Sequence, residues 1–275
     1  MSEKRPPRLS AWRFVVTFGT VSLLADFVYE GARSVTGPVL ALLGATGLVV
    51  GIVTGVGEAA SLLLRLVSGP LADRTQRFWA WTIAGYAITV ISVPLLGYAS
   101  ILWVACGLVI LERVGKAIRG PSKDALLSYA TAATGRGRGF AVHEAIDQFG
   151  AVIGPLVVAA VLAVTNTDYG PALAVLALPG VLALGLVVWL RARVPHPIDY
   201  EVDPKPHVSL TLPTERVRLP RAFWLYAAFT ATTVLGFATF GIISFHIVEA
   251  GLLEPVWVPV LYAGVMVVDA LAALA

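Results

Sequence analysis

Four charged side chains lie deep inside long apolar stretches of this sequence: Glu58, Glu112, Arg113 and Asp147. Each is roughly nine to eleven residues into its stretch, which at a helical rise of about 1.5 Å per residue corresponds to the middle of a membrane. A charge at that depth costs roughly 2.5–3.5 kcal/mol, so such a residue faces the interior of a helix bundle or water. Two interpretations stay open: a structural ion pair of Arg113 with one of the three acids, or a relay for protons or a solute.

Acidic residues outnumber basic ones among these positions. An unpaired carboxylate in a poorly hydrated site favours its protonated form, which a proton carrier needs. Two further acids, Asp26 and Glu30, are four residues apart and therefore share one helix face. We expect Asp26 in the outer half of its helix as a cation or proton site. We expect Glu30 near the outer surface, where simple solvation is the competing interpretation. The surplus of acids favours proton coupling or a cationic solute.

The composition places these residues in membrane-spanning helices. Of the 275 residues, 57% are hydrophobic and 13% are charged, whereas soluble domains carry about 25% charged residues. Runs of roughly 20 apolar residues span a membrane as helices, because an open sheet leaves its backbone unpaired in lipid. The sequence therefore predicts an all-α integral membrane bundle of about eight spanning helices, at 11–33, 47–68, 78–99, 101–119, 138–164, 170–190, 222–248 and 255–275. A soluble or nucleic-acid-binding protein is excluded as the main interpretation.

A proline-rich segment separates the sixth predicted span from the seventh. It divides the chain into an N-terminal bundle of six helices at 1–193, a linker at 194–221 and the start of a second bundle at 222–275. The Lys and Arg residues outside the spans lie at the helix ends on one side of the membrane, with Arg33 as the exception. The ends rich in basic residues face the cytoplasm. We therefore expect a multi-pass protein of the cytoplasmic membrane, with its N-terminus in the cytoplasm.

Glycine spacing on two predicted helices favours close helix contacts. One helix has glycines spaced by four, at Gly47, Gly51 and Gly55. Another contains the string GAVIGP, which includes Gly150, Gly154 and Pro155. Small residues at this spacing form a smooth strip along the helix, which we call a glycine ridge, and this strip lets a second helix backbone approach closely. We expect both ridges to pack against neighbouring helices and Pro155 to kink its helix.

The turn after the second predicted span reads GPLADRTQRF, at 69–78. It resembles the signature loop of the major facilitator superfamily, G-x-L-x-D-R-x-G-R-R/K. The matching residues are Gly69, Leu71, Asp73, Arg74 and Arg77. Gln76 replaces the second glycine of the signature and Phe78 its last basic residue. GAVIGP is in turn similar to the core of the superfamily's antiporter motif in the fifth helix.

A narrower likeness, over about 25–155, is to an uncharacterised group of bacterial superfamily members. It includes the strings GEAASLLLRLVSGPLADR and RGRGFAVHEAIDQFGAVIGPL. The residues shared with that group are Asp26, Glu30, Glu58, His143 and Asp147, which adds His143 to the candidate relay. HEAID, at 143–147, does not predict a zinc site, because Asp147 stands where a zinc-binding helix motif needs its second histidine.

The resemblance implies a secondary transporter that moves a small solute by alternating access, without enzymatic activity and without a cofactor. Proton coupling fits the buried acids, and the antiporter likeness slightly favours efflux. In the superfamily the aspartate of the signature loop steadies one conformational state, which implies a gating role for Asp73. The expected partners are the lipid bilayer, a small solute and protons.

Superfamily members have two six-helix halves. This chain provides one half, the linker and about two helices of the second half, so we expect a truncated chain whose C-terminal half is missing. The alternative function is a non-transporting membrane module, or a half-transporter that needs a partner chain. A membrane-embedded enzyme that uses His143 or Glu144 is a third interpretation.

Overall fold

The computed structural model describes residues 9–200 and 219–274. These residues form ten α-helices and one 3-10 helix and contain no strand, so the predicted all-α fold is confirmed. The elements are α1 (Ala11–Leu42), α2 (Gly47–Thr75), α3 (Phe78–Gly97), α4 (Leu102–Thr134), α5 (Arg136–Val164), α6 (Tyr169–Ala174), α7 (Ala177–Arg193), η1 (Pro197–Tyr200), α8 (Arg221–Leu235), α9 (Phe240–Glu249) and α10 (Trp257–Leu274).

Five segments of the described chain are long and apolar enough to cross a membrane, so this is a multi-pass membrane protein. They are Ala11–Leu42, Gly47–Thr75, Phe78–Gly97, Gly137–Val164 and Tyr169–Arg193, the last of which comprises α6 and α7. α4 has 33 residues but is set apart from these five by its charges. Those charges include Glu112, Arg113, Lys116 and Arg119.

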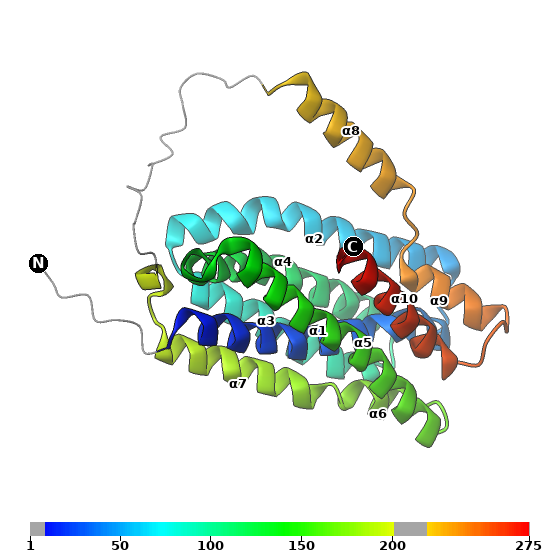
Figure 1. Cartoon of the computed structure of the whole chain (residues 1–275). Helices are drawn as coiled ribbons and strands as arrows, with labels where there is room; N and C mark the ends of the chain where they lie inside the picture. The colour runs from blue at the N-terminus through cyan, green and yellow to red at the C-terminus, as the bar shows by residue number, and fades with distance from the viewer. Residues whose placement is uncertain (1–8, 201–218, 275) are drawn as a thin grey trace, which may run out of the picture.

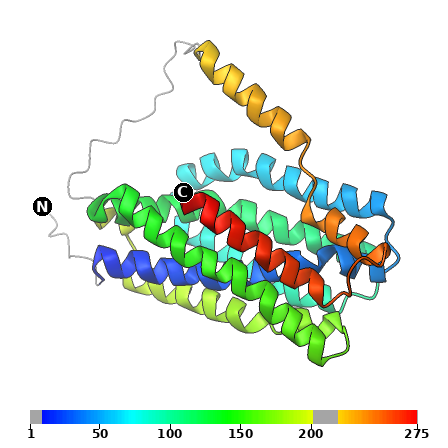
Figure 2. The same cartoon turned by 45° about the vertical axis from the view of Figure 1, so that its right-hand side comes forward.

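α1 is the helix around which the bundle is built. It packs most extensively against α5 and also contacts α7, α9 and α4 (Figure 1). α3 pairs mainly with α4, and α2 packs on the other side of the same helix (Figure 2). Any polar side chain on α1 therefore meets side chains from several helices at once.

Two apolar clusters hold the ends of α1. Near its N-terminus, Phe14 and Phe18 are fully buried, and their ring centroids lie 6.2 and 6.3 Å from that of Trp79 on α3. Near its C-terminus, Val35 and Leu40 are fully buried in a cluster that draws on α2, α3, α4 and α5. Asp26, Glu30 and Arg33 of α1 lie between these two clusters.

Two helices extend beyond their predicted ends at Arg33 and Arg119. α1 continues to Leu42 and α4 to Thr134. Both predicted ends were wrong because each arginine has a carboxylate partner on another helix. Arg33 lies 3.1 Å from Glu58, and Arg119 lies 4.0 Å from Asp26. A basic residue does not mark a helix end where a neighbouring helix supplies the opposite charge.

The helix predicted at 222–248 is broken into α8 and α9. α8 ends at Leu235, α9 begins at Phe240, and Gly236 lies in the break. Glycine disfavours a helix interior by about 1 kcal/mol relative to alanine, which favours an end there. Both views in Figures 1 and 2 show α8 apart from the bundle, whereas α9 packs on α1 and α2, and α10 packs on α5.

The predicted linker at 194–221 lies mostly outside the described residues, which stop at Tyr200 and resume at Leu219. Its first part returns to the start of α1, because the hydroxyl of Tyr200 donates a hydrogen bond of 2.8 Å to the carbonyl of Leu9. Burial raises the pKa of Tyr200 to about 12, so this hydroxyl remains a donor at neutral pH.

Candidate functional site

α1 carries three charged residues at spacings of three or four, which places them along one side of the helix: Asp26, Glu30 and Arg33. Glu30 is buried, with 7% of its surface exposed. Simple solvation of Glu30, the competing interpretation, is therefore wrong, and α1 continues beyond this residue to Leu42. α1 therefore places a carboxylate and a guanidinium inside the bundle.

A chain of ion pairs joins α1, α2 and α4. Arg33 lies 3.1 Å from Glu58 of α2 and 3.9 Å from Glu30. Arg113 of α4 lies 3.3 Å from Glu58 and 3.5 Å from Glu112. We call these five residues the Arg33–Arg113 network. Glu58 is shared by both arginines and connects the two halves of the network.

The ion pairs of Arg113 are close but poorly aligned for hydrogen bonding. Arg113 is 5% exposed, yet its Nε and Nη1 atoms lack a hydrogen-bond partner among the described residues. The Oε1 atom of Glu112 also lacks one within the same part of the chain. Buried polar groups in this condition cost about 1–3 kcal/mol each. The network therefore retains unused hydrogen-bonding capacity.

Two tyrosines border this network. The hydroxyl of Tyr262 on α10 donates a hydrogen bond of 2.5 Å to Glu30. The ring of Tyr29 lies beside three cations: Lys116 Nζ is 3.5 Å from its centroid, and the guanidinium carbons of Arg113 and Arg33 are 4.8 and 5.8 Å from it. Desolvated contacts of this kind stabilise a cation by about 2 kcal/mol. Tyr29 thus stabilises positive charge inside the bundle.

A second polar group lies nearer the N-terminus of α1. Asp26 is 4.0 Å from Arg119 of α4, and Arg119 donates a hydrogen bond of 2.9 Å to Thr89 of α3. His143 of α5 and Ser22 of α1 share a hydrogen bond of 2.9 Å. Within residues 9–200 and 219–274, no group of three or more His, Cys, Asp or Glu side chains is arranged to hold a metal ion.

Asp147 belongs to this second group and not to the Arg33–Arg113 network. It is half-buried, and its Oδ1 atom has no hydrogen-bond partner in the described part of the chain. Its main charged neighbours are Asp26 and Lys123. The suggested pairing of Arg113 with Asp147 is therefore absent, because α5 directs Asp147 toward the N-terminal half of α1.

The surplus of acids predicted from the sequence is wrong for this interior as a whole. The Arg33–Arg113 network, the second polar group and the nearby lysines together form what we call the charge cluster. It contains five acids and five bases: Asp26, Glu30, Glu58, Glu112 and Asp147, with Arg33, Arg113, Lys116, Arg119 and Lys123. Most of these bases were not predicted as interior residues, because basic residues near the end of an apolar run are typical of helix ends. A signal was present, since the basic residues of α4 recur every three or four positions and so share a face. Tyr262 had no such signal, because it lies 232 positions from Glu30.

The signature loop forms the end of α2 and the turn before α3, and Gly69 lies inside α2. Asp73, Arg74 and Arg77 are exposed and form no ion pair with another described residue. Gln76 adopts a left-handed conformation with φ of 52°, and its side-chain amide donates a hydrogen bond of 2.6 Å to the carbonyl of Asp73. Glycine adopts this conformation most easily, which explains why the signature has glycine where this chain has Gln76.

The two glycine ridges differ. At Gly150 and Gly154, an added Cβ would meet backbone carbonyls of α1. At Gly51 and Gly55, no atom of the described residues lies within 4 Å of such a Cβ. At Gly47, the first glycine of the α2 ridge, the added Cβ would lie 3.4 Å from the ring of Phe245 on α9. The predicted close contact is therefore present along the α5 ridge, whereas on α2 it is limited to Gly47. Pro155 lies inside α5, which continues to Val164, and its predicted kink stays a prediction.

Comparison with known proteins agrees with this architecture. A sequence model described as Major Facilitator Superfamily matches residues 22–275. Uncharacterised proteins of Mycobacterium bovis and Mycobacterium tuberculosis are 66% identical over 269 residues, which is 98% of this chain and 66% of theirs. An uncharacterised MFS-type transporter of Methanocaldococcus jannaschii is 29% identical over 140 residues, or 51% of this chain and 35% of that protein.

The chain thus spans about two thirds of the length of its mycobacterial relatives. The superfamily model covers nearly the whole chain, and the described residues form the apolar helical bundle that this family requires. The chain therefore belongs to the Major Facilitator Superfamily.

Proposed function

We propose that this chain works in a secondary active transporter that carries a small solute across the cytoplasmic membrane by alternating access, coupled to protons. Its family supports transport and not enzymatic activity. Glu30 carries the proposal: this carboxylate is 7% exposed and contacts both Arg33 of its own helix and Tyr262 of α10. Glu30 therefore touches two segments that would move relative to each other during alternating access.

Protonation of Glu30 would change the balance of these contacts. As a carboxylate, Glu30 accepts the hydrogen bond of Tyr262 and attracts Arg33. As a neutral acid it loses the attraction for Arg33, which keeps Glu58 as a partner at 3.1 Å. The hydrogen bond from Tyr262 also weakens, because a hydrogen bond to a charged acceptor is roughly twice as strong as one to a neutral acceptor. A proton at Glu30 therefore weakens the contact between α1 and α10. In this way proton binding is linked to helix separation.

The solute would bind beside the Arg33–Arg113 network. The equal number of acids and bases removes the support for a cationic solute, which rested on a surplus of acids. The unsatisfied N–H groups of Arg113 and the unsatisfied oxygen of Glu112 suit a solute that has both an acceptor and a donor. The likeness of GAVIGP to the antiporter motif supports efflux as the direction.

A closed seam at one end of the bundle supports alternating access. An added Cβ at Gly37 of α1 would collide with the carbonyl of Gly241 on α9. The hydroxyls of Thr54 on α2 and Thr239 lie 2.8 Å apart. On the proposed topology, with a cytoplasmic N-terminus, this seam is at the outer end. Asp73, at the opposite end of α2, is the proposed gating residue.

Reconstitution into sealed vesicles with an internal pH dye tests the proposal. Amino acids, sugars, organic anions and organic cations are added in turn under a pH gradient, to this chain and to a full-length mycobacterial relative. We expect one class to drive proton movement. We expect Glu30→Gln to abolish this movement, and Glu144→Gln, which removes an exposed acid of α5, to preserve it.

Proton movement at the wild-type rate in Glu30→Gln would contradict the coupling role. A response from the longer relative alone would indicate that this chain is a half-transporter that needs a partner. No response from either chain would favour the non-transporting module.

A further inference from the structure

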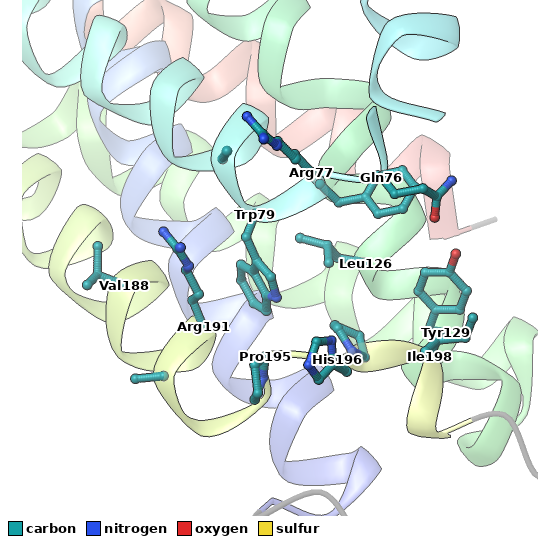
Figure 3. Close-up of a pocket in the computed structure, with 14 residues that line it drawn as sticks. Gln76, Arg77, Trp79, Leu126, Tyr129, Val188, Arg191, Pro195, His196 and Ile198 are labelled. Atoms are coloured by element: carbon teal, nitrogen blue, oxygen red, sulfur yellow. The ribbon is translucent and has the colours of Figure 1, made fainter. Parts of the chain in front are cut away.

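A cavity of about 860 Å³ opens at the end of the bundle where α1 begins, away from the charge cluster. It lies between the turn that precedes α3, the C-terminal part of α4, the end of α7 and η1 (Figure 3). In Figure 3, Gln76 and Arg77 lie along one side of the cavity, and Pro195, His196 and Ile198 lie along the other. Elements distant in the sequence therefore form one concave surface.

The cavity is positively charged. Arg77, Arg191 and His196 line it, and none of its lining residues is Asp or Glu. Both arginines are exposed, and neither forms an ion pair with another described residue. Such a surface attracts an anion. The planar guanidinium of arginine matches the oxygens of a phosphate or carboxylate better than a lysine does.

The wall beneath these charges is apolar. Trp79 is 7% exposed, and its indole N–H donates a hydrogen bond of 3.2 Å to the carbonyl of Val194, which fixes the ring. Phe78 and Leu126 line the cavity beside it, together with Val188, which is 49% exposed on α7. A ligand that fills this cavity therefore needs both a charged group and an apolar part.

The cavity lies at the level where helices leave the membrane. α3 begins at Phe78, and the apolar span Tyr169–Arg193 ends beside the cavity. Trp189, 40% exposed near the end of α7, has the position typical of tryptophan at the boundary between lipid and water. Lipid headgroups occupy this level.

We propose that this cavity binds the phosphate group of an anionic phospholipid, through Arg77 and Arg191, with the glycerol end of the lipid against Trp79 and Leu126. A soluble phosphate compound shares the charged group but lacks the apolar part. On the proposed topology the cavity faces the cytoplasmic leaflet, whose anionic lipids attract basic side chains. This inference concerns lipid binding and does not rest on the proposed transport function.

Lipid retention by the purified chain tests this site. The chain is placed in nanodiscs of phosphatidylcholine with or without phosphatidylglycerol. The protein is then released from the nanodiscs, and the lipids that remain bound to it are counted by native mass spectrometry. The test variant combines Arg77→Gln with Arg191→Gln. The matched control combines Arg13→Gln with Arg193→Gln, which removes the same charge near the same end of the bundle but outside the cavity lining.

We expect the wild type and the control to prefer phosphatidylglycerol. The test variant should lose roughly tenfold of this preference for each arginine removed, since a direct hydrogen bond to a charged group contributes at least a factor of about that size. Combining Arg77→Lys with Arg191→Lys should retain part of the preference, because the charge remains. An equal preference in all variants, or an equal loss in the test and control variants, would overturn the proposal.

A separate arm titrates inorganic phosphate into the phosphatidylcholine nanodiscs. We expect weaker binding there than of the lipid, and competition between the two. If phosphate binds and phosphatidylglycerol is not preferred, the ligand is a soluble phosphate compound and the assignment to a lipid is wrong.

Discussion

The glycine ridges of α5 and α2 have the same spacing but different surroundings. On α5, the carbonyls of Leu23 and Phe27 in α1 lie where a Cβ of Gly150 or Gly154 would be. On α2, the space beside Gly51 is open among the described residues, and the neighbouring Ile52 is 55% exposed. Spacing alone therefore defines a smooth helix face. Whether that face is used depends on which helix runs beside it, and α1 runs beside α5.

The largest effect is expected from Gly154→Ala. The new methyl group would collide with the carbonyl of Phe27, a backbone atom that cannot rotate away. Overpacking of this kind costs typically about 1–3 kcal/mol, and we expect the upper end because α1 must shift. Thermal unfolding in detergent, followed by circular dichroism, measures the change. Stability equal to the wild type would show that α1 and α5 are not in the described contact.

An intermediate effect is expected from Gly37→Ala. The methyl group would collide with Gly241, but α9 has only ten residues and can move away from α1 without disturbing α5. We expect a smaller loss of stability than for Gly154→Ala. We also expect weaker disulfide cross-linking between Thr54→Cys and Thr239→Cys, introduced with Cys106→Ser. Unchanged cross-linking would contradict the close approach of α1 and α9.

The smallest effect is expected from Gly51→Ala. No described atom lies within 4 Å of the new methyl group, and alanine is a better helix former than glycine by about 1 kcal/mol. We expect thermal stability equal to or slightly above that of the wild type. A loss as large as that of Gly154→Ala would mean that the two ridges are equally packed.

Helices were easier to predict from this sequence than their partners. A run of apolar residues is a local property, so the spans of α2, α3 and α5 were predicted near their observed positions. The depth of a residue such as Glu112 follows from counting along its own helix. Arg33 and Arg119 were assigned to helix ends because their carboxylate partners come from other helices.

The composition of the charge cluster was less predictable for the same reason. The number of charges in the cluster depends on which faces of four helices meet, and the sequence of one helix alone does not contain that information. Only one part of the cluster has a local signal: the basic residues of α4 recur every three or four positions and so share one face. The contact between Glu30 and Tyr262 joins helices far apart in the chain, and no local pattern indicates it.

The central position of α1 has a consequence for membrane insertion. α1 is synthesised before its neighbours, and an unpaired charge at mid-bilayer costs roughly 2.5–3.5 kcal/mol. Glu30 has Arg33 on its own helix at 3.9 Å, but Asp26 acquires Arg119 only after α4 has been made. The nascent α1 is therefore a poor candidate for early release into lipid. We expect α1 to stay beside the translocon until α4 has been made, and the two helices to enter the lipid together.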